Sequence, residues 1–245
     1  MRSDVRDTFD RLAIEYDELK LRVIPGYRQV QDLALRYASA HPSRWQHVLE
    51  LGCGTGEWAS VFLRAHSEAD YLAIDVSPKM RDLASARLAG YGTRFRLLDG
   101  DLDASLPEGP FDLVVSFFAI HHVENKQRLA HEVFGCLASG GLFLYADITV
   151  APDAGLERSF LDGWVAFMRR AGLEEERIPH ILADHREHDM AESASAQLSF
   201  LRAAGFAPAE VWSWEKFALF YAAKPTLAAQ QGAAPDGRVT VGGRG

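Results

Sequence analysis

Glycines occupy alternate positions in the run VLELGCGTGEW, residues 48–58, as Gly52, Gly54 and Gly56. Because glycine has no Cβ, such a backbone can turn tightly and approach a ligand closely at the start of a helix. Asp75 ends the next apolar run about 20 residues beyond the loop, where a carboxylate can accept hydrogen bonds from ribose hydroxyls. A plain tight turn is one alternative and a dinucleotide site another, but the dinucleotide fingerprint is G-x-G-x-x-G rather than G-x-G-x-G. The spacing favours S-adenosylmethionine as the ligand.

Residues near the other strand ends complete this predicted cofactor site. In LLDGDLD, Asp101 could accept a hydrogen bond from an adenine amino group, a role for which the neighbouring acids compete, and Leu102 could pack on the ring. Met80 could cover the other face of the adenine or belong to the core. A helix cap is the alternative role for Asp75, and Ser77 ahead of a proline serves that role better.

Two histidines, His121 and His122, close the apolar run SFFAIHHV. Ligands of open α/β sheets bind at the carboxyl ends of the strands, so we expect both imidazoles in the site. A neutral imidazole could take a proton from a hydroxyl, thiol or amine, which makes His122 the candidate catalytic acid/base and His121 a candidate substrate contact. The alternative is a pair that only shapes the pocket, because methyl transfer to an amine or thiolate needs mainly in-line placement.

A polar cluster lies further along, in the run PHILADHREHDM, residues 179–190. Its chemistry-bearing members are His180, Asp184, His185, His188 and Asp189. Spacings of three and four could place subsets of them on one helix face as metal ligands, but a solvated helix of mixed charge has the same composition. We expect no metal and a substrate-binding cap, with His185 as a substrate contact and Trp164, Phe167 and Met168 as an apolar wall or as helix core.

The elements that must position these residues follow from hydrophobic periodicity. Apolar positions at helical spacing predict two N-terminal helices, separated by Pro25 and Gly26. Short apolar runs separated by helical segments then predict a βαβ chain, and consecutive apolar positions within them indicate parallel strands covered on both faces. A last helix and the runs FAPAEVWSW and FALFYAAK predict a closing antiparallel hairpin.

Five runs, ELGCGTGEW, AIDVSPKM, GDLDASLP, FDLVVSFFAIHHV and LASGGLFLYADI, resemble successive motifs of class I, Rossmann-like S-adenosylmethionine-dependent methyltransferases, over roughly residues 45–223. The resemblance implies a doubly wound α/β fold, with a mostly parallel seven-stranded sheet whose last strand is antiparallel. It also implies a cofactor lying across the strand ends.

The resemblance implies the remaining cofactor contacts as well. These are Tyr16, Glu50, Cys53, Val76, Ser116 and Phe117. Glu50 and the glycine loop would surround the methionine part of the cofactor, and the backbone near Ser116 and Phe117 would meet its amino group. The phrase FDRLAIEYDEL is similar to family members in which the equivalent of Tyr16 approaches the cofactor carboxylate, so the N-terminal helices would form a lid.

These expectations divide the chain into five parts. They are an N-terminal helical lid at 1–44, a cofactor-binding core at 45–150, a helical cap at 151–195, a closing helix and hairpin at 196–224, and a disordered tail at 225–245.

Composition limits the partners and the location. A formal charge of −8 lacks the basic field that attracts nucleic acid, so we expect none. The longest apolar run, residues 113–120, is far short of the ~20 residues that span a bilayer, and the N-terminus does not resemble a secretory signal. Only two cysteines are present, which fits a reducing compartment. We therefore expect a cytoplasmic monomer or homodimer.

Three functions remain in view. The first is transfer of a methyl group from S-adenosylmethionine to an O, N or S atom of a small molecule, which releases S-adenosylhomocysteine. The second is a non-catalytic, regulatory S-adenosylmethionine-binding protein, since no catalytic base is compelling. The third is an NAD-dependent oxidoreductase, which the glycine spacing opposes. Fold alone does not decide among them.

Overall fold

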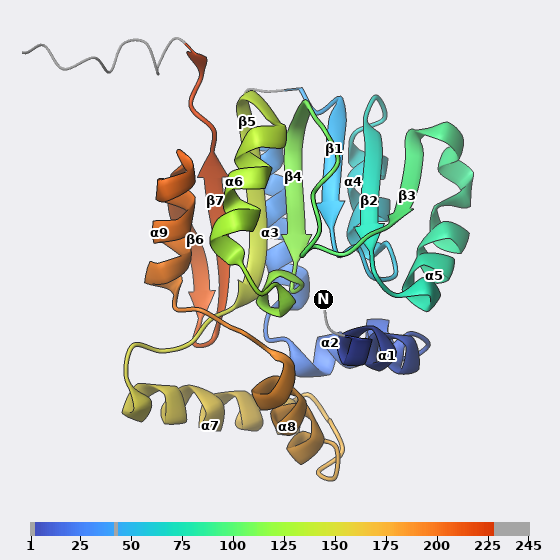
Figure 1. Cartoon of the computed structure of the whole chain (residues 1–245). Helices are drawn as coiled ribbons and strands as arrows, with labels where there is room; N and C mark the ends of the chain where they lie inside the picture. Colours follow the sequence, from blue (N-terminus) through green and yellow to red (C-terminus); the bar gives the residue numbers. More distant parts are fainter. Residues whose placement is uncertain (1–2, 42–43, 228–245) are drawn as a thin grey trace, which may run out of the picture.

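A seven-stranded sheet forms the centre of the computed structural model, which describes residues 3–41 and 44–227 (Figure 1). Its strands are β1 (His47–Leu51), β2 (Asp70–Asp75), β3 (Phe95–Asp99), β4 (Phe111–Phe117), β5 (Leu137–Ile148), β6 (Ala207–Trp214) and β7 (Phe217–Ala223). The order across the sheet is β3-β2-β1-β4-β5-β7-β6. Strand β7 pairs antiparallel with β5 and β6, and the other pairs are parallel. The predicted fold class and closing hairpin are confirmed.

Helices cover both faces of this sheet (Figure 1). On one face lie α3 (Tyr27–Ala40), α4 (Glu57–Ala65) and α5 (Pro78–Leu88), which the turn η1 (Ala89–Arg94) follows, and on the other lie α6 (Lys126–Cys136) and α9 (Ala194–Ala204). Neighbouring residues of β1 serve the two faces, because Val48 packs into the first core and Leu49 into the second, both fully buried. This is why consecutive positions of these strands are apolar.

The N-terminal segment forms one helix more than the sequence predicts. The first predicted helix is divided into α1 (Ser3–Leu12) and α2 (Tyr16–Val23), and α3 is the second. Tertiary contacts account for the division, since no glycine or proline lies between α1 and α2. The Asp10 carboxylate of α1 accepts hydrogen bonds from the Ser77 hydroxyl and the Lys79 N–H at the start of α5, while α2 packs against the cap. The lid is therefore tied to the core at one end and to the cap at the other.

The insertion after β5 is helical, as predicted, and consists of α7 (Ala154–Arg170) and α8 (Ile178–His188). Figure 1 places it beside the lid, below the carboxyl ends of the parallel strands. The Trp164 indole N–H donates to the Val23 carbonyl at 2.7 Å, and the Arg177 guanidinium makes two hydrogen bonds to the Glu15 carboxylate, at 2.8 and 2.9 Å. Cap and lid thus close the same edge of the sheet.

Three remaining expectations concern the cysteines, membrane spans and the tail. Cys53 and Cys136 are both free and buried. Within the described ranges no helix is long and apolar enough to cross a membrane. Most of the predicted tail, residues 228–245, lies outside the described residues, but the N–H of Leu227 donates to the Ser139 hydroxyl at 2.9 Å.

Candidate functional site

Two recesses meet at the carboxyl ends of the strands. The strand-end recess, of about 470 Å³, is lined by the glycine loop and by residues at the ends of β2 and β4. The cap cavity, of about 810 Å³, lies between the lid, the cap and the turn after β4. Phe9, Tyr16, Phe118 and His122 line both, so these four side chains stand where the recesses meet. Eight predicted cofactor contacts line the strand-end recess: Tyr16, Gly52, Gly54, Asp75, Val76, Met80, Leu102 and Phe117.

A side chain at each of the three loop glycines would meet different surroundings. All three have positive φ angles, of 71° at Gly52, 53° at Gly54 and 74° at Gly56. A Cβ at Gly52 would lie 2.4 Å from the Ala119 methyl, and one at Gly56 would lie 2.8 Å from a leucine methyl of α5. At Gly54 the nearest atom, Tyr16 Cε1, would be 3.6 Å away, an ordinary contact. Packing therefore requires glycine at Gly52 and Gly56, whereas Gly54 faces open recess.

Asp75 ends β2 and organises the loop around it. Its Oδ2 accepts the Gly54 N–H at 2.7 Å, and its Oδ1 accepts the Ser77 N–H at 2.9 Å. Burial raises the pKa of Asp75, although these two hydrogen bonds lower it in part. Each carboxylate oxygen has a second lone pair, which remains for a ligand hydroxyl. The helix cap is indeed Ser77, whose hydroxyl accepts the Met80 N–H at 3.1 Å.

A smaller recess behind the glycine loop is lined by Glu50, Cys53, Tyr16 and Lys20, among others. Burial raises the pKa of Glu50 to about 8, although the hydrogen bond from the Tyr71 hydroxyl, at 3.0 Å, lowers it in part. Burial also raises the pKa of the Tyr16 phenol and of the Cys53 thiol. The recess therefore holds a carboxyl group that is neutral at neutral pH and that an approaching ammonium group can ionise.

Three predicted cofactor contacts, Gly56, Asp101 and Ser116, line none of these recesses. Gly56 lies against α5. The Asp101 carboxylate accepts the Asp103 N–H at 2.9 Å, and the Ser116 hydroxyl donates to the Leu51 carbonyl at 2.8 Å. Their positions as contacts stay predictions, while the residues after Asp101 and Ser116 do line the strand-end recess.

Among the lining residues that were not predicted from the sequence, three have marked contacts or backbone geometry. Phe9 packs edge-on against Tyr16 and His122, with ring centroids 5.8 and 5.4 Å apart, and its spacing of seven from Tyr16 was an available signal. Lys20 is buried, contacts two carboxylates and lies over the Tyr16 ring. Phe118 has a φ of 58°, a conformation that is costly for a bulky residue and that no local pattern foretells.

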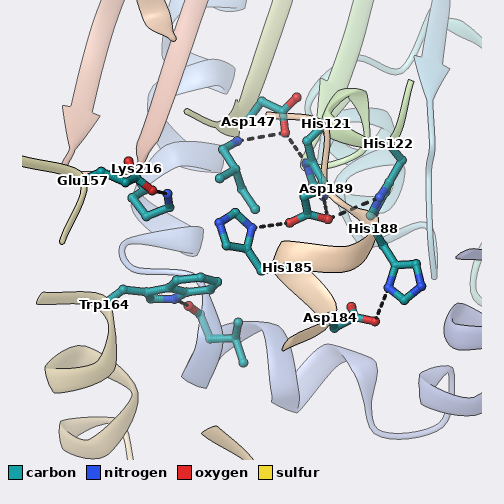
Figure 2. Close-up of polar contacts among 12 residues, drawn as sticks. His121, His122, Asp147, Glu157, Trp164, Asp184, His185, His188, Asp189 and Lys216 are labelled. Carbon is teal, nitrogen blue, oxygen red and sulfur yellow. Dashed lines mark hydrogen bonds and ion pairs between the residues drawn. The ribbon is translucent and has the colours of Figure 1, made fainter. Parts of the chain in front are cut away.

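Both histidines of the turn η2 (Ile120–His122) are buried and point toward Asp189 of the cap (Figure 2). His121 Nδ1 is hydrogen-bonded to the Asp147 carboxylate, and its Nε2 lies 3.6 Å from Asp189 Oδ1. His122 Nδ1 lies 3.4 Å from the same oxygen. The cap is held here by the Met190 N–H, which donates to the His121 carbonyl at 2.8 Å.

The charges of this cluster differ sharply between neighbours. Burial lowers the pKa of His121, but the Asp189 and Asp147 carboxylates outweigh it and raise that pKa to about 9. Burial and the neighbouring His121 lower the pKa of His122 to about 3. Burial raises the pKa of Asp189, yet His121 and His185 outweigh it and lower that pKa to about 2. At neutral pH a charged imidazole thus stands beside a neutral one.

The cap cavity contains both predicted substrate contacts of the cap, Trp164 and His185. Trp164 is almost fully buried and packs edge-on against the His185 ring, with centroids 5.3 Å apart. His185 Nδ1 lies 2.7 Å from Asp189 Oδ2, and His188 Nδ1 lies 2.9 Å from Asp184 Oδ1 (Figure 2). The structure thus brings together the histidines of the core and the acids of the cap.

Known proteins match both the sequence and the fold. Residues 48–141 match the model of a methyltransferase domain family. A carboxy-S-adenosyl-L-methionine synthase from Wolinella succinogenes is 26% identical over 88% of this chain and 92% of its own length. A demethylmenaquinone methyltransferase from Leptospira interrogans is 29% identical over 59% of this chain and 60% of its own.

Among solved structures, an S-adenosylmethionine-dependent methyltransferase from Mesorhizobium loti shares the fold, with a TM-score of 0.58 and 22% identity. The match covers 79% of this chain and 97% of that one. The strand order, the glycine loop at the end of β1 and these matches lead to one assignment. Residues 48–141 match a methyltransferase domain family, and the fold is the class I, Rossmann-like fold of S-adenosylmethionine-dependent methyltransferases.

Proposed function

We propose that the protein transfers the methyl group of S-adenosylmethionine, bound in the strand-end recess, to a small acceptor bound in the cap cavity. The observation that carries the proposal is that the two recesses share a wall, formed by Phe9, Tyr16, Phe118 and His122. A donor and an acceptor that meet there react within one assembled site, so placement alone contributes much of the catalysis. The cap cavity is lined mainly by apolar and aromatic side chains with a few polar groups among them, as small-molecule sites are.

The cofactor contacts proposed for this reaction follow from the recess walls. Asp75 would accept the ribose hydroxyls, Met80 and Leu102 would flank the adenine, and Glu50 with the glycine loop would surround the methionine part. Glu50 is suited to the methionine ammonium, because its raised pKa lets it gain a full charge only when a cation arrives.

The role of His122 is narrower than general acid/base catalysis. With a pKa of about 3, lowered by burial and by His121, its imidazole is neutral but a weak proton acceptor near neutral pH. We propose that His122 contacts the reacting atoms at the junction of the recesses. Proton removal from the acceptor then needs another agent, or an acceptor that is already nucleophilic.

Carboxylation is the second candidate, because the synthase from Wolinella succinogenes matches nearly its whole length. The product in that enzyme's name carries an added carboxylate, which calls for a cation in the site. Among the described residues that line the strand-end recess and the cap cavity there is no arginine, Lys20 is already paired with two carboxylates, and the charged His121 faces Asp147 and Asp189. Asp184 and Asp189 also line the cap cavity and would repel an anion. Methyl transfer is therefore the first choice.

Ligand binding tests the cofactor assignment. S-adenosylhomocysteine at a hundred times its Kd should stabilise the folded chain by about 2.7 kcal/mol, which raises the Tm of a domain of this size by about 5 to 10 °C. NAD, the control ligand, should leave the Tm unchanged. A shift with NAD alone would overturn the assignment.

Turnover tests the reaction. Incubation with S-adenosylmethionine and a panel of phenols, alcohols, amines and thiols should give a methylated product and S-adenosylhomocysteine, both measured by mass spectrometry. A carboxylated nucleoside product formed in the presence of a carboxylate donor would favour the second candidate. Binding without any turnover would favour the regulatory alternative.

A further inference from the structure

A set of three metal-binding atoms is assembled where the core meets the cap. One donor atom from each of His121, His122 and Asp189 can be chosen so that all three lie within 4.8 Å of one another. His121 Nε2 and His122 Nδ1 lie 3.6 and 3.4 Å from the same oxygen, Asp189 Oδ1. Zinc bonds of about 2.0–2.2 Å in tetrahedral geometry separate neighbouring donors by about 3.4 Å. These two distances match the edges of such a site.

His122 gives an independent sign of an absent ligand. Its side chain is only 7% exposed, yet Nδ1 makes no hydrogen bond to any residue in the described part of the chain. Figure 2 shows this nitrogen directed toward Asp189. Buried polar atoms of folded proteins nearly always have a partner, so an ion between these two side chains would satisfy the nitrogen.

Asp147 and His185 hydrogen-bond to His121 and Asp189 from the side away from the proposed ion, as the outer partners of metal ligands do in proteins. Asp147 is fully buried and bonds to His121 Nδ1, so Nε2 faces Asp189, and an ion bound there would replace the proton that Nε2 carries in the charged imidazole. His185 engages Asp189 Oδ2, which leaves Oδ1 on the side of the two imidazoles. A carboxylate behind an imidazole fixes its tautomer and strengthens it as a ligand.

The position of the set indicates a reactive site rather than a structural one. His121, His122 and Asp189 all line the cap cavity, and His122 lines the strand-end recess too. Three protein ligands beside a cavity leave room for a substrate atom as the fourth, as in catalytic zinc sites. Two imidazoles and one carboxylate favour Zn²⁺, Co²⁺ or Fe²⁺ over Mg²⁺, which takes oxygen ligands.

We propose that His121, His122 and Asp189 bind a divalent transition-metal ion of the zinc class, which holds the oxygen atom of the methyl acceptor. The role of the ion rests on the proposed function, and it narrows the acceptor to an alcohol or a phenol. Coordination lowers the pKa of the acceptor hydroxyl, which releases its proton to water. The oxygen then attacks the sulfonium methyl carbon. The new C–O bond forms as the C–S bond breaks, and the electron pair of the C–S bond stays on sulfur.

This arrangement explains how the reaction proceeds without a strong protein base. The lone pair of His122 Nδ1 binds the ion and does not take the proton of the acceptor. Sequence inspection named all three residues but did not combine them, because Asp189 lies on the cap and both histidines follow β4. The cap histidines that the sequence singled out, His185 and His188, instead pair with acids of their own helix end.

Metal titration of the full chain tests the site. The protein is stripped with a chelator, dialysed, and titrated with Zn²⁺ by calorimetry and with Co²⁺ by visible absorption, which reports nitrogen and oxygen ligation. One equivalent should bind, and excess Mg²⁺ should not compete. H122Q and D189N should each lower the Zn²⁺ affinity at least tenfold, and D147N should lower it by about 10- to 100-fold. Circular dichroism of the stripped variants checks that they are folded.

The matched control is H180Q, since His180 is an exposed histidine on α8, the cap helix that ends just before Asp189. It should bind Zn²⁺ as the wild type does. The site is overturned if the wild type binds no Zn²⁺, if H122Q and D189N bind it with wild-type affinity, or if H180Q loses as much affinity as they do.

Two further readouts separate this proposal from the proposed function. S-adenosylhomocysteine should bind the stripped protein with unchanged affinity, because its contacts lie in the strand-end recess. If the metal-loaded wild type does not bind S-adenosylhomocysteine, the proposed function is refuted while the metal site is not. Full turnover on a hydroxyl acceptor by stripped protein in chelator would refute the role of the ion and leave the function standing.

Discussion

Two glycines of one loop, Gly54 and Gly56, should fail in different ways when each is replaced by alanine. Both have positive φ angles, so either alanine costs about 1–2 kcal/mol of backbone strain. The smaller entropy of the unfolded alanine chain offsets about 0.4–1 kcal/mol of this. At Gly54 the new methyl finds only ordinary contact with Tyr16, at 3.6 Å. The net loss of unfolding free energy there should lie between about 0 and 1.6 kcal/mol.

At Gly56 the methyl also has to displace α5. It would lie 2.8 Å from Leu88 Cδ1 and 3.1 Å from Ala84 Cβ, and overpacking of this kind costs about 1–3 kcal/mol more. The net loss for Gly56→Ala is then about 1 to 4.6 kcal/mol, or about 2 to 18 °C in Tm for a domain of this size. Gly54→Ala should shift the Tm by about 6 °C at most.

Cofactor binding should follow the opposite order. The methyl at Gly54 enters the recess, so calorimetry should show at least a tenfold loss of S-adenosylhomocysteine affinity, or about 1.4 kcal/mol. Gly56→Ala, measured well below its Tm, should keep its affinity within a few-fold, because Gly56 lines no recess. Equal Tm values for the two variants would refute the packing argument. Wild-type affinity in Gly54→Ala would remove the loop from the cofactor site.

Three other substitutions test the remaining reasoning. Asp75→Asn should lower both the Tm and the S-adenosylhomocysteine affinity, because the NH2 group of the asparagine would face one of the two backbone N–H groups that now donate to the carboxylate. An unchanged S-adenosylhomocysteine affinity in calorimetry would exclude Asp75 from the site. In the wild type, Glu50 keeps its proton up to about pH 8 when folded and loses it near pH 4.5 when unfolded, so stability falls as pH rises between these values, by up to about 5 kcal/mol. Glu50→Gln cannot ionise and should lack this contribution, so its change in unfolding free energy between pH 5 and pH 8, measured in urea, should differ from that of the wild type by several kcal/mol. The same change in both proteins would contradict the buried neutral acid. Trp164→Ala should lower the unfolding free energy by about 3–5 kcal/mol, because it leaves a cavity and removes the hydrogen bond to the Val23 carbonyl. Wild-type stability in this variant would show that Trp164 does not hold the cap to the lid.

The tertiary structure changes how two of these residues are understood. The sequence indicated a role for Asp75 in cofactor binding, and its two backbone hydrogen bonds also make it part of the loop's structure. The sequence left Trp164 as an apolar wall of the substrate cap or as helix core, and in the structure its indole also joins the cap to the lid. Variants at these positions therefore need a stability measurement beside every affinity or rate.

What the sequence determined by itself is local and periodic. Consecutive apolar positions indicated parallel strands with two covered faces, and the alternate glycines after β1 and the acid ending β2 indicated a ligand loop, because each signal lies within a few residues of chain. Only the tertiary structure decided that Gly56 packs on α5, that α1 and α2 are separate helices, and that Asp189 meets His121 and His122. These features depend on contacts between segments far apart in the chain, and such contacts are set by how whole elements pack rather than by any local pattern.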